Sequence, residues 1–201
     1  NQENSSKSDN YGLTFDGSNE YIDTGDAFTS LTSFSISAWF KSDDTSTAAQ
    51  GIVSSRINSI GSSQGLDLNI SGDVLYARIF NNGATEVTTA FTDTASWHHV
   101  AMTYNGTTLE LFLDNVSQGT ATGVYTNSAA NWVIGKWNNG AYYFDGSISQ
   151  LSFFDYALSS TQISTLYGSS ELGSTSPMAL KPQPVAYYPL GDNSASNPLT
   201  Q

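Results

Sequence analysis

Apolar and polar residues alternate along several short stretches of the chain. In residues 34–40, Phe, Ile, Ala and Phe occupy every second position, and Ser35, Ser37 and Trp39 lie between them. Successive side chains of a β-strand point to opposite faces, so this period of two predicts a half-buried strand of an antiparallel sheet. The same alternation recurs in residues 66–70, 74–80, 109–113 and 148–154.

Turn-forming residues separate these stretches. They lie at residues 71–73, 81–83, 105–106 and 139–140. Asn105-Gly106 stands between two apolar runs, which predicts a tight hairpin. Many short strands at near-regular spacing, with little helical periodicity between them, predict an all-β fold, either a sandwich or a jelly roll.

One short helix is expected near the C-terminal end of this strand-rich region. Ser159 and Gln162 form the pattern of a capping box, Ile163 and Leu166 follow at helical spacing, and Gly168 supplies a stop. The helix should span one or two turns.

The 201 residues suit a single large sandwich with flanking segments. Residues 1–10 are polar and are expected to be a disordered or linker N-terminus, and residues 11–168 form the predicted domain. Residues 169–184 are rich in Ser, Pro and Gly and are typical of a linker. Residues 185–201 carry an extra strand, whose apolar face we expect to pair with its own sheet or with that of a neighbouring copy.

Composition narrows the class of partner. The chain has 18 acidic and 6 basic residues, for a net charge of −12, which repels nucleic acid and anionic membranes. No apolar run is long enough for insertion into a membrane as a helix. There is no cysteine, so no disulfide framework holds the fold.

Three segments in order resemble laminin-G-like domains, of the kind shared with pentraxins and of the concanavalin A-like jelly-roll type. Residues 13–22 contain Phe-Asp-Gly followed by Tyr-Ile, and residues 96–114 contain Trp-His-His-Val-Ala and end in Leu-Asp. Residues 144–159 begin with Phe-Asp-Gly-Ser-Ile and end in Ala-Leu-Ser. The resemblance implies two antiparallel sheets of six or seven strands each.

The tail, residues 185–192, resembles the strand that normally leads such a domain, yet here it comes last. Either it begins the next repeat of a tandem array, or it folds back as an edge strand of its own sandwich. Pro189 suits an edge, because proline donates no hydrogen bond to a sheet. Similar tandem domains occur in bacterial surface proteins and in phage structural proteins.

The sequence predicts that the protein is not an enzyme. Glucanases of this superfamily carry a Glu-x-Asp-x-Glu strand, which is absent. His98 and His99 are adjacent and therefore point to opposite faces of a strand, and His99 fits a structural position of the resemblance. No nucleophile motif or phosphate loop is present.

The resemblance also raises the question of calcium, which relatives bind through carboxylate, amide and carbonyl oxygens. Asp16 and Asp145 lie in Phe-Asp-Gly turns that the resemblance brings together as the first and last strands pair. The acidic clusters of pentraxins are replaced by residues 136–139 and 149–150, so a pentraxin-type double site is not expected. The sequence leaves two alternatives open, one structural Ca²⁺ ion or no bound calcium. The candidate ligands are Asp16, Asn19, Asp23 and Asp145.

A stretch rich in aromatic and amide side chains offers a candidate glycan site, because sugar rings pack on aromatic faces and amides bind hydroxyls. The alternative for this stretch is hairpin packing, with one of its two tyrosines in the core. Trp39, Trp97 and Trp132 occupy strand-like positions and are predicted to be core residues. The candidate ligand-binding residues are Trp137, Asn138, Asn139, Tyr142 and Tyr143.

Together these features predict a non-catalytic recognition or adhesion module, outside the cell or on a cell or virion surface, that binds carbohydrate or another extracellular ligand. The alternative is a structural repeat or decoration domain in a virion, appendage or cell-surface assembly. Its contacts would then be to neighbouring copies of itself.

Overall fold

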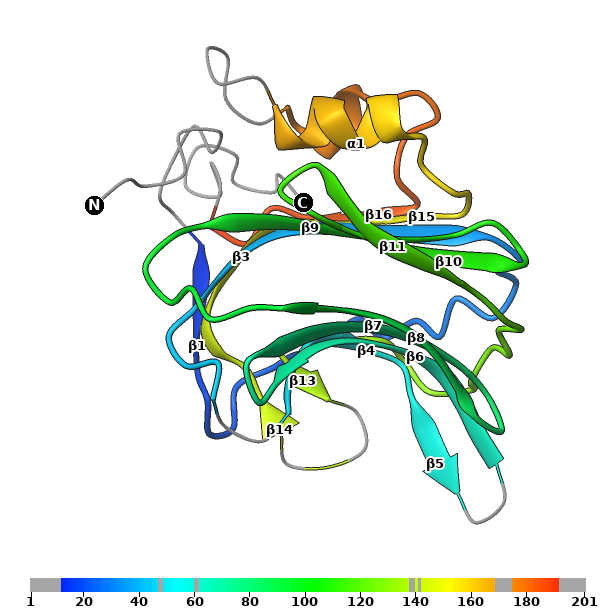
Figure 1. The fold of residues 1–201 in the computed structure, drawn as a ribbon, viewed down its shortest axis with the longest axis horizontal. Coiled ribbons are helices and arrows are strands. Elements are labelled where there is room, and N and C mark those ends of the chain that lie inside the picture. The colour runs from blue at the N-terminus through cyan, green and yellow to red at the C-terminus, as the bar shows by residue number, and fades with distance from the viewer. Residues whose placement is uncertain are drawn as a thin grey trace.

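A computed structural model describes residues 12–46, 49–59, 62–137, 140, 142–168 and 175–191. In these residues two antiparallel sheets lie face to face, and a single core fills the space between them (Figure 1). This confirms the predicted all-β, two-sheet jelly-roll sandwich with one short helix near the C-terminal end of the domain.

Sheet A has seven described strands. Its order is β1 (Leu13–Asp16), β15 (Asp145–Phe154), β3 (Phe34–Ser42), β9 (His98–Tyr104), β10 (Thr108–Leu113) and β11 (Val116–Thr122), and β16 (Ala186–Tyr188) also pairs with β15. The hairpin predicted at Asn105-Gly106 joins β9 to β10.

Sheet B also has seven described strands. Its order is β2 (Ile22–Asp23), β12 (Val133–Ile134), β4 (Gln50–Ser54), β6 (Ser62–Ser71), β7 (Val74–Asn81) and β8 (Ala84–Ala90), and β5 (Ile57–Ser59) pairs with β6. A separate two-stranded ribbon, β13 (Lys136–Trp137) and β14 (Tyr142–Tyr143), lies against the outer side of this sheet (Figure 1).

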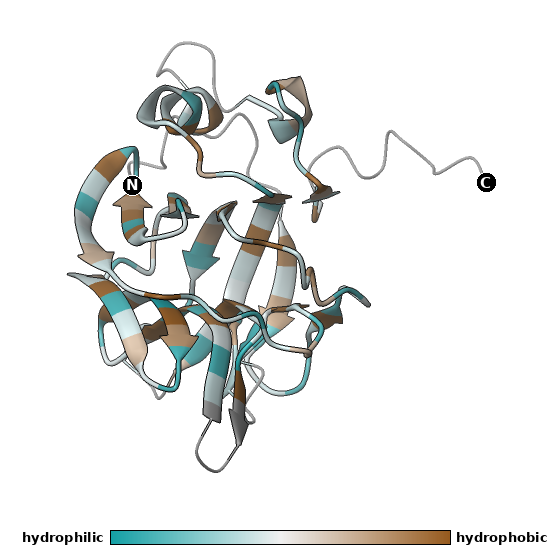
Figure 2. Ribbon diagram, turned by 90° about the vertical axis from the view of Figure 1, so that its right-hand side faces the viewer, coloured by the Kyte–Doolittle hydropathy of each residue, from teal (hydrophilic) through white to brown (hydrophobic). Residues whose placement is uncertain are grey.

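The predicted alternation places alternate side chains of β3 in the core. Figure 2 shows hydrophobic and hydrophilic residues as bands of colour along the strands. The other face of β3 is buried too, contrary to the half-buried strand expected from the sequence. The reason is tertiary: Trp39 stacks on Tyr167 of the helix, with ring centroids 5.7 Å apart, so the helix shields this face from water.

Helix α1 (Ser160–Tyr167) begins and ends where the sequence predicted. Ser159 is the N-cap, its hydroxyl and the Gln162 side chain form the capping box, and Gly168 is the C-cap. The helix buries Ile163 and Leu166 in a second cluster on the outer face of sheet A. Figure 1 places α1 beside sheet A and away from sheet B.

The C-terminal strand β16 pairs with β15 of its own chain, end to end with β1 along the same edge. The Val185 N–H donates to the Phe153 carbonyl at 2.8 Å, and the Gln150 N–H donates to the Pro189 carbonyl at 3.0 Å. Tyr188 and two neighbouring apolar side chains pack against the main core. The predicted pairing of this segment with a sheet is therefore found within one chain.

None of the described helices is long and apolar enough to cross a membrane.

Candidate functional site

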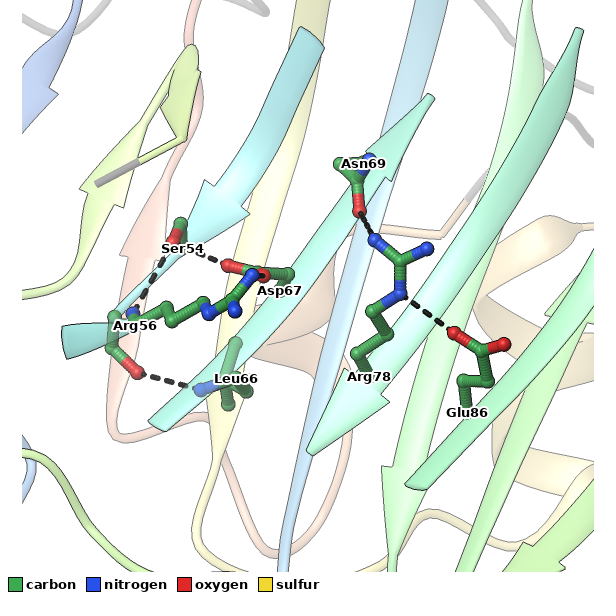
Figure 3. A network of polar contacts seen from close by, with 8 residues as sticks. Ser54, Arg56, Leu66, Asp67, Asn69, Arg78 and Glu86 are labelled. Carbon is green, nitrogen blue, oxygen red and sulfur yellow. Dashed lines mark hydrogen bonds and ion pairs between the residues drawn. The ribbon is translucent and has the colours of Figure 1, made fainter. Parts of the chain in front are cut away.

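The outer face of sheet B carries a row of polar side chains from four neighbouring strands. Strand register pairs Ser54 with Asp67, Asp67 with Arg78, and Arg78 with Glu86. Their neighbours along β6 and β7 point into the core, so these side chains point away from it (Figure 3). The next outward pair on the same two central strands is Asn69 and Tyr76.

Asp67 is the most buried charged group of this row, with no exposed surface. The Ser54 hydroxyl donates to its Oδ1 at 2.6 Å, and Arg56 Nη1 lies 3.6 Å from its Oδ2. Burial raises the pKa of Asp67 to about 6, against the opposing effects of Ser54, Arg56, Arg78 and the Trp137 indole. The carboxylate is therefore mostly ionised at neutral pH, although its environment favours the neutral form.

Arg78 connects this row of polar side chains with the neighbouring pair, Asn69 and Tyr76. Its Nε donates to Glu86 Oε2 at 2.8 Å, and its Nη1 donates to Asn69 Oδ1 at 3.4 Å. The guanidinium carbon lies 3.7 Å from the ring centroid of Tyr76, so cation–π attraction adds to these polar contacts. The side chain is held on three sides by named partners.

Arg56 is held between aromatic rings. Its guanidinium carbon lies 4.2 Å from the ring centroid of Phe80 and 5.2 Å from that of Trp137. The Trp137 ring contacts the Tyr142 ring across the β13–β14 ribbon, with centroids 5.1 Å apart. The aromatic ribbon therefore stands directly beside the polar row.

Gly51 allows the ribbon to lie this close to the sheet. A Cβ atom at Gly51 would stand 2.2 Å from the carbonyl carbon of Lys136 and 2.3 Å from the backbone nitrogen of Trp137. Backbone cannot yield as a flexible side chain can, so any larger residue at this position must push β13 away from β4.

Four buried polar atoms at this place have no hydrogen-bond partner among the described residues: Arg56 Nε, Asp67 Oδ2, Asn69 Nδ2 and Trp137 Nε1. The Trp137 N–H is near enough to Asp67 to favour its ionised form, but does not meet hydrogen-bond geometry. A buried polar group without a partner costs about 1–3 kcal/mol, so such groups normally bind ordered water or a ligand. We call the surface formed by Arg56, Asp67, Asn69, Arg78 and Trp137 the Arg56 face.

The structure divides the ligand-binding residues expected from the sequence. Trp137 stands beside Arg56, and Tyr142, which is 39% exposed, contacts Trp137. Tyr143 pairs with Lys136, and its ring lies near that of Tyr21, with centroids 6.3 Å apart. It therefore belongs to the other side of the ribbon. Neither tyrosine is part of the buried core. Asn138 and Asn139 lie outside the described residues.

Most of the Arg56 face was not anticipated from the sequence. Asp67, Asn69 and Arg78 occur at the polar positions of alternating strands, and Arg56 lies in the short connection between β4 and β5. A signal was nevertheless present, because charged residues make up only 12% of this chain and two of its six cations belong to this one sheet face.

The expected meeting of Asp16 and Asp145 is confirmed, because these residues face each other in the β1–β15 register. Backbone N–H groups of Ser18 and Asn19 donate to Asp16 and lower its pKa. Burial raises the pKa of Asp145, and the carboxylates of Asp43, Asp44 and Asp16 raise it further. Negative charge is thus concentrated at this end of the sandwich.

Of the two remaining candidate calcium ligands, Asn19 lies beside Asp16, to which its backbone N–H donates, but Asp23 does not join the pair. Asp23 lies in β2 of sheet B, where its Oδ1 accepts hydrogen bonds from the Gly25 N–H and the Asn131 side chain, both at 2.9 Å. In the described residues no group of three His, Cys, Asp or Glu side chains is arranged to hold a metal. Calcium at Asp16 and Asp145 therefore stays a prediction.

The two histidines have different surroundings. His99 is buried, its Nε2 lies 2.8 Å from Ser37 Oγ, and burial lowers its pKa to about 4, which fits the structural role predicted for it. His98 Nδ1 lies 2.6 Å from Asp114 Oδ2, and its Nε2 lies 3.2 Å from Asp93 Oδ2. Burial opposes protonation of His98, but Asp114 and Asp93 outweigh it and raise its pKa.

Comparison with protein families agrees with this architecture. A family model described as the concanavalin A-like lectin/glucanases superfamily matches residues 16–164. The chain belongs to this family. No curated protein sequence matches it.

Several solved structures share this fold at low sequence identity. The CBM40 domain of the Ruminococcus gnavus IT-sialidase, bound to α2,3-sialyllactose, is 14% identical, with a TM-score of 0.63 and coverage of 76% of this chain and 94% of that chain. Domain 4 of AbnA, a GH43 extracellular arabinanase from Geobacillus stearothermophilus, in complex with arabinotriose, is 19% identical, with a TM-score of 0.56 and coverage of 75% and 73%. A heptameric SAP-like pentraxin from Limulus polyphemus is 16% identical, with a TM-score of 0.52 and coverage of 81% and 79%.

Proposed function

We propose that this protein is a non-catalytic carbohydrate-binding domain and that the Arg56 face of sheet B is its binding site. One observation carries the proposal: Trp137 and its neighbouring rings stand beside buried polar atoms that have no hydrogen-bond partner.

The chemistry of this face suits a sugar. Aromatic faces of Trp137 and Tyr142 can pack against the C–H faces of a sugar ring. Carboxylate, amide and guanidinium groups beside them can accept from or donate to its hydroxyls. The solved CBM40 and arabinanase domains, whose structures contain sialyllactose and arabinotriose, support a carbohydrate ligand for this fold.

The carboxylates of the face favour binding over catalysis. Glycosidases use two carboxyl groups on either side of the scissile bond, one as acid and one as base or nucleophile. Here Asp67 accepts a hydrogen bond from Ser54 and is paired with Arg56, while Glu86 is paired with Arg78. Both groups are engaged in holding arginines.

We further propose that the domain works outside the cell, on a cell or virion surface, where glycans are presented. The −12 net charge suits this setting, because it keeps the protein away from anionic membranes and nucleic acid. The ligand is then a glycan of a surface or of a surrounding matrix.

Glycan-array binding of the purified chain, followed by calorimetric titration of the best ligand, tests the proposal. We expect Trp137→Ala to weaken binding by at least about tenfold, or about 1.4 kcal/mol, because the substitution removes the ring face on which the sugar would pack. Tyr21→Ala is the matched control, because it removes a 45% exposed ring on the other side of the same ribbon. Persistent absence of binding to any glycan would favour the structural-repeat alternative.

A further inference from the structure

We infer that the Arg56 face selects uncharged sugars over carboxylated ones, with one sugar hydroxyl donating to Asp67 Oδ2 and a second accepting from Asn69 Nδ2. This inference rests on the proposed function, because it assumes that a glycan binds at this face. It names the class of glycan that the face takes.

Charge balance is the first reason. Each arginine of the face already has a carboxylate partner: Asp67 lies 3.6 Å from Arg56, and Glu86 lies 2.8 Å from Arg78. Lys136 lies over the rings of Tyr21 and Tyr143, on the other side of the ribbon. Among the described residues, a carboxylated sugar would therefore meet no unpaired cation at this face, in a protein whose net charge is −12.

The unsatisfied atoms give the second reason. They comprise one carboxylate acceptor, Asp67 Oδ2, and three N–H donors, on Arg56, Asn69 and Trp137. A hydroxyl both donates and accepts, so hydroxyls can satisfy the whole set. A ligand carboxylate only accepts, and it would repel the Asp67 carboxylate that needs a donor.

Spacing along β6 indicates how many hydroxyls take part. Asp67 and Asn69 are two residues apart on one face of the strand, so their Cα atoms are separated by roughly 7 Å and their side chains run side by side. A single oxygen cannot reach both. Two hydroxyls of one sugar ring are needed, with the ring lying along the strand beside Trp137.

Arg56 controls access to Asp67. Figure 3 shows its guanidinium next to the Asp67 carboxylate, where the two form an ion pair without a hydrogen bond. The remaining described contacts of the guanidinium are to ring faces, which do not fix its rotation. A small movement of this long side chain admits a hydroxyl, which donates to Asp67 Oδ2 while it accepts from Arg56 Nε.

The ionisation of Asp67 adds a pH dependence to this selection. Its pKa of about 6 reflects burial first, with Ser54 of β4, Arg56, Arg78 of β7 and Trp137 of β13 opposing. Glu86 of β8 faces it only through Arg78. Below pH 6 the carboxyl group of Asp67 is mostly protonated, and it then no longer accepts hydrogen bonds from both Ser54 and the sugar hydroxyl. Affinity for a neutral sugar should therefore fall roughly tenfold from pH 7 to pH 5.

An array that presents each neutral oligosaccharide beside its carboxylated counterpart, such as lactose beside sialyllactose, tests the selectivity at pH 7. We expect the bound sugars to be neutral, with at least about tenfold weaker binding of their carboxylated counterparts. Equal or tighter binding of the carboxylated members would overturn the inference and leave the proposed function standing. Binding to no member would overturn both.

Asp67→Asn tests the mechanism, because it keeps the shape of the side chain and replaces the unsatisfied acceptor with a donor. We expect the variant to remain folded in a thermal melt, to bind the neutral sugar at least about tenfold more weakly at pH 7, and to lose the pH dependence between pH 5 and 8. Asp155→Asn is the control, since it removes an exposed carboxylate elsewhere with the same change in charge.

Two results count against this mechanism. One is wild-type affinity that stays constant from pH 7 to pH 5, a measurement that needs no variant. The other is a folded Asp67→Asn protein that binds the neutral sugar as the wild type does, which would mean that buried water alone satisfies Asp67 and Asn69.

Discussion

Burial of the Asp67 carboxylate destabilises the folded protein at neutral pH. Its pKa is about 6 in the folded protein against an ordinary value of 3.8, so between these values the folded state binds more protons than the unfolded state. Stability therefore falls as pH rises through this window. At about 1.4 kcal/mol for each pKa unit, the cost at pH 7 is on the order of 3 kcal/mol. Such a cost at a surface of unpaired polar atoms is typical of a functional site.

The cost can be measured by urea unfolding at pH 7 and pH 5. We expect the wild type to gain about 1 kcal/mol more than Asp67→Asn when the pH is lowered, because only the wild type is relieved of a buried charge. Protonation of His98, whose pKa is raised, stabilises both proteins in the same direction and cancels in the comparison. Equal gains in the two proteins would show that Asp67 is not destabilised in this way.

Residue-level prediction from the sequence succeeded where strand register decides the outcome. Asp16 and Asp145 were expected to meet because their turns belong to strands that pair, and they do. Asp67 and Asn69 were missed because alternation assigns a polar position to solvent. Asp67 is contacted by Arg56 and lies near Trp137 of a ribbon that packs against β4, and Asn69 is contacted by Arg78 of β7. No periodicity in β6 encodes these contacts.

Among the elements, helix α1 was predictable to the residue, because its start and stop are local signals. The β13–β14 ribbon was not, because two-residue strands carry no periodicity and their place depends on a distant contact. That contact is the close passage of β13 over Gly51 of β4.

Gly51→Ala tests this dependence of the ribbon on the sheet. The added Cβ would stand 2.2 Å from backbone of Lys136, so we expect β13 to shift, stability to fall by about 1–3 kcal/mol and glycan binding to weaken. Gly83→Ala is the matched control, since a Cβ there meets nothing within 4 Å. Denaturant melts and titrations of both variants give the measurement. A Gly51→Ala protein as stable and as tightly binding as the control would contradict the described packing.

The paired ends of β1 and β15 carry the calcium prediction. A cation would relieve the repulsion between Asp16 and Asp145, so calcium should raise the melting temperature by mass action on the folded state. The remaining oxygens of the six to eight that Ca²⁺ takes would come from backbone and water. Asp145→Asn should abolish this response, and Asp23→Asn, in the other sheet, should keep it. Identical wild-type melts in excess calcium and in chelator would rule the ion out.

At the scale of the whole molecule, the two sheets have different roles. Sheet A is covered on its outer side by α1, and β16 completes its edge, whereas the outer side of sheet B carries the Arg56 face. The sandwich class was predictable, because it follows from the repeated alternation. The sequence did not predict which sheet would keep an uncovered outer face for a ligand, since this depends on where the helix and the ribbon pack.

The pairing of β16 with β15 predicts a self-contained unit. Deleting residues 184–201 should lower the melting temperature, because it uncovers apolar side chains and unpaired backbone along β15. It should also promote association as concentration rises, which sedimentation would detect. A truncated protein with unchanged stability, solubility and assembly would mean that this strand contributes nothing to the fold.

The central claim is that a glycan binds on the outer face of sheet B. Titration of ¹⁵N-labelled protein with the best array ligand, followed by amide chemical shifts, tests it most directly. The account predicts that the largest shifts occur at Arg56, on β6 and β7 around Asp67 and Arg78, and at the indole N–H of Trp137. Shifts confined to sheet A, or to residues 17–21 beside Tyr143, would contradict it.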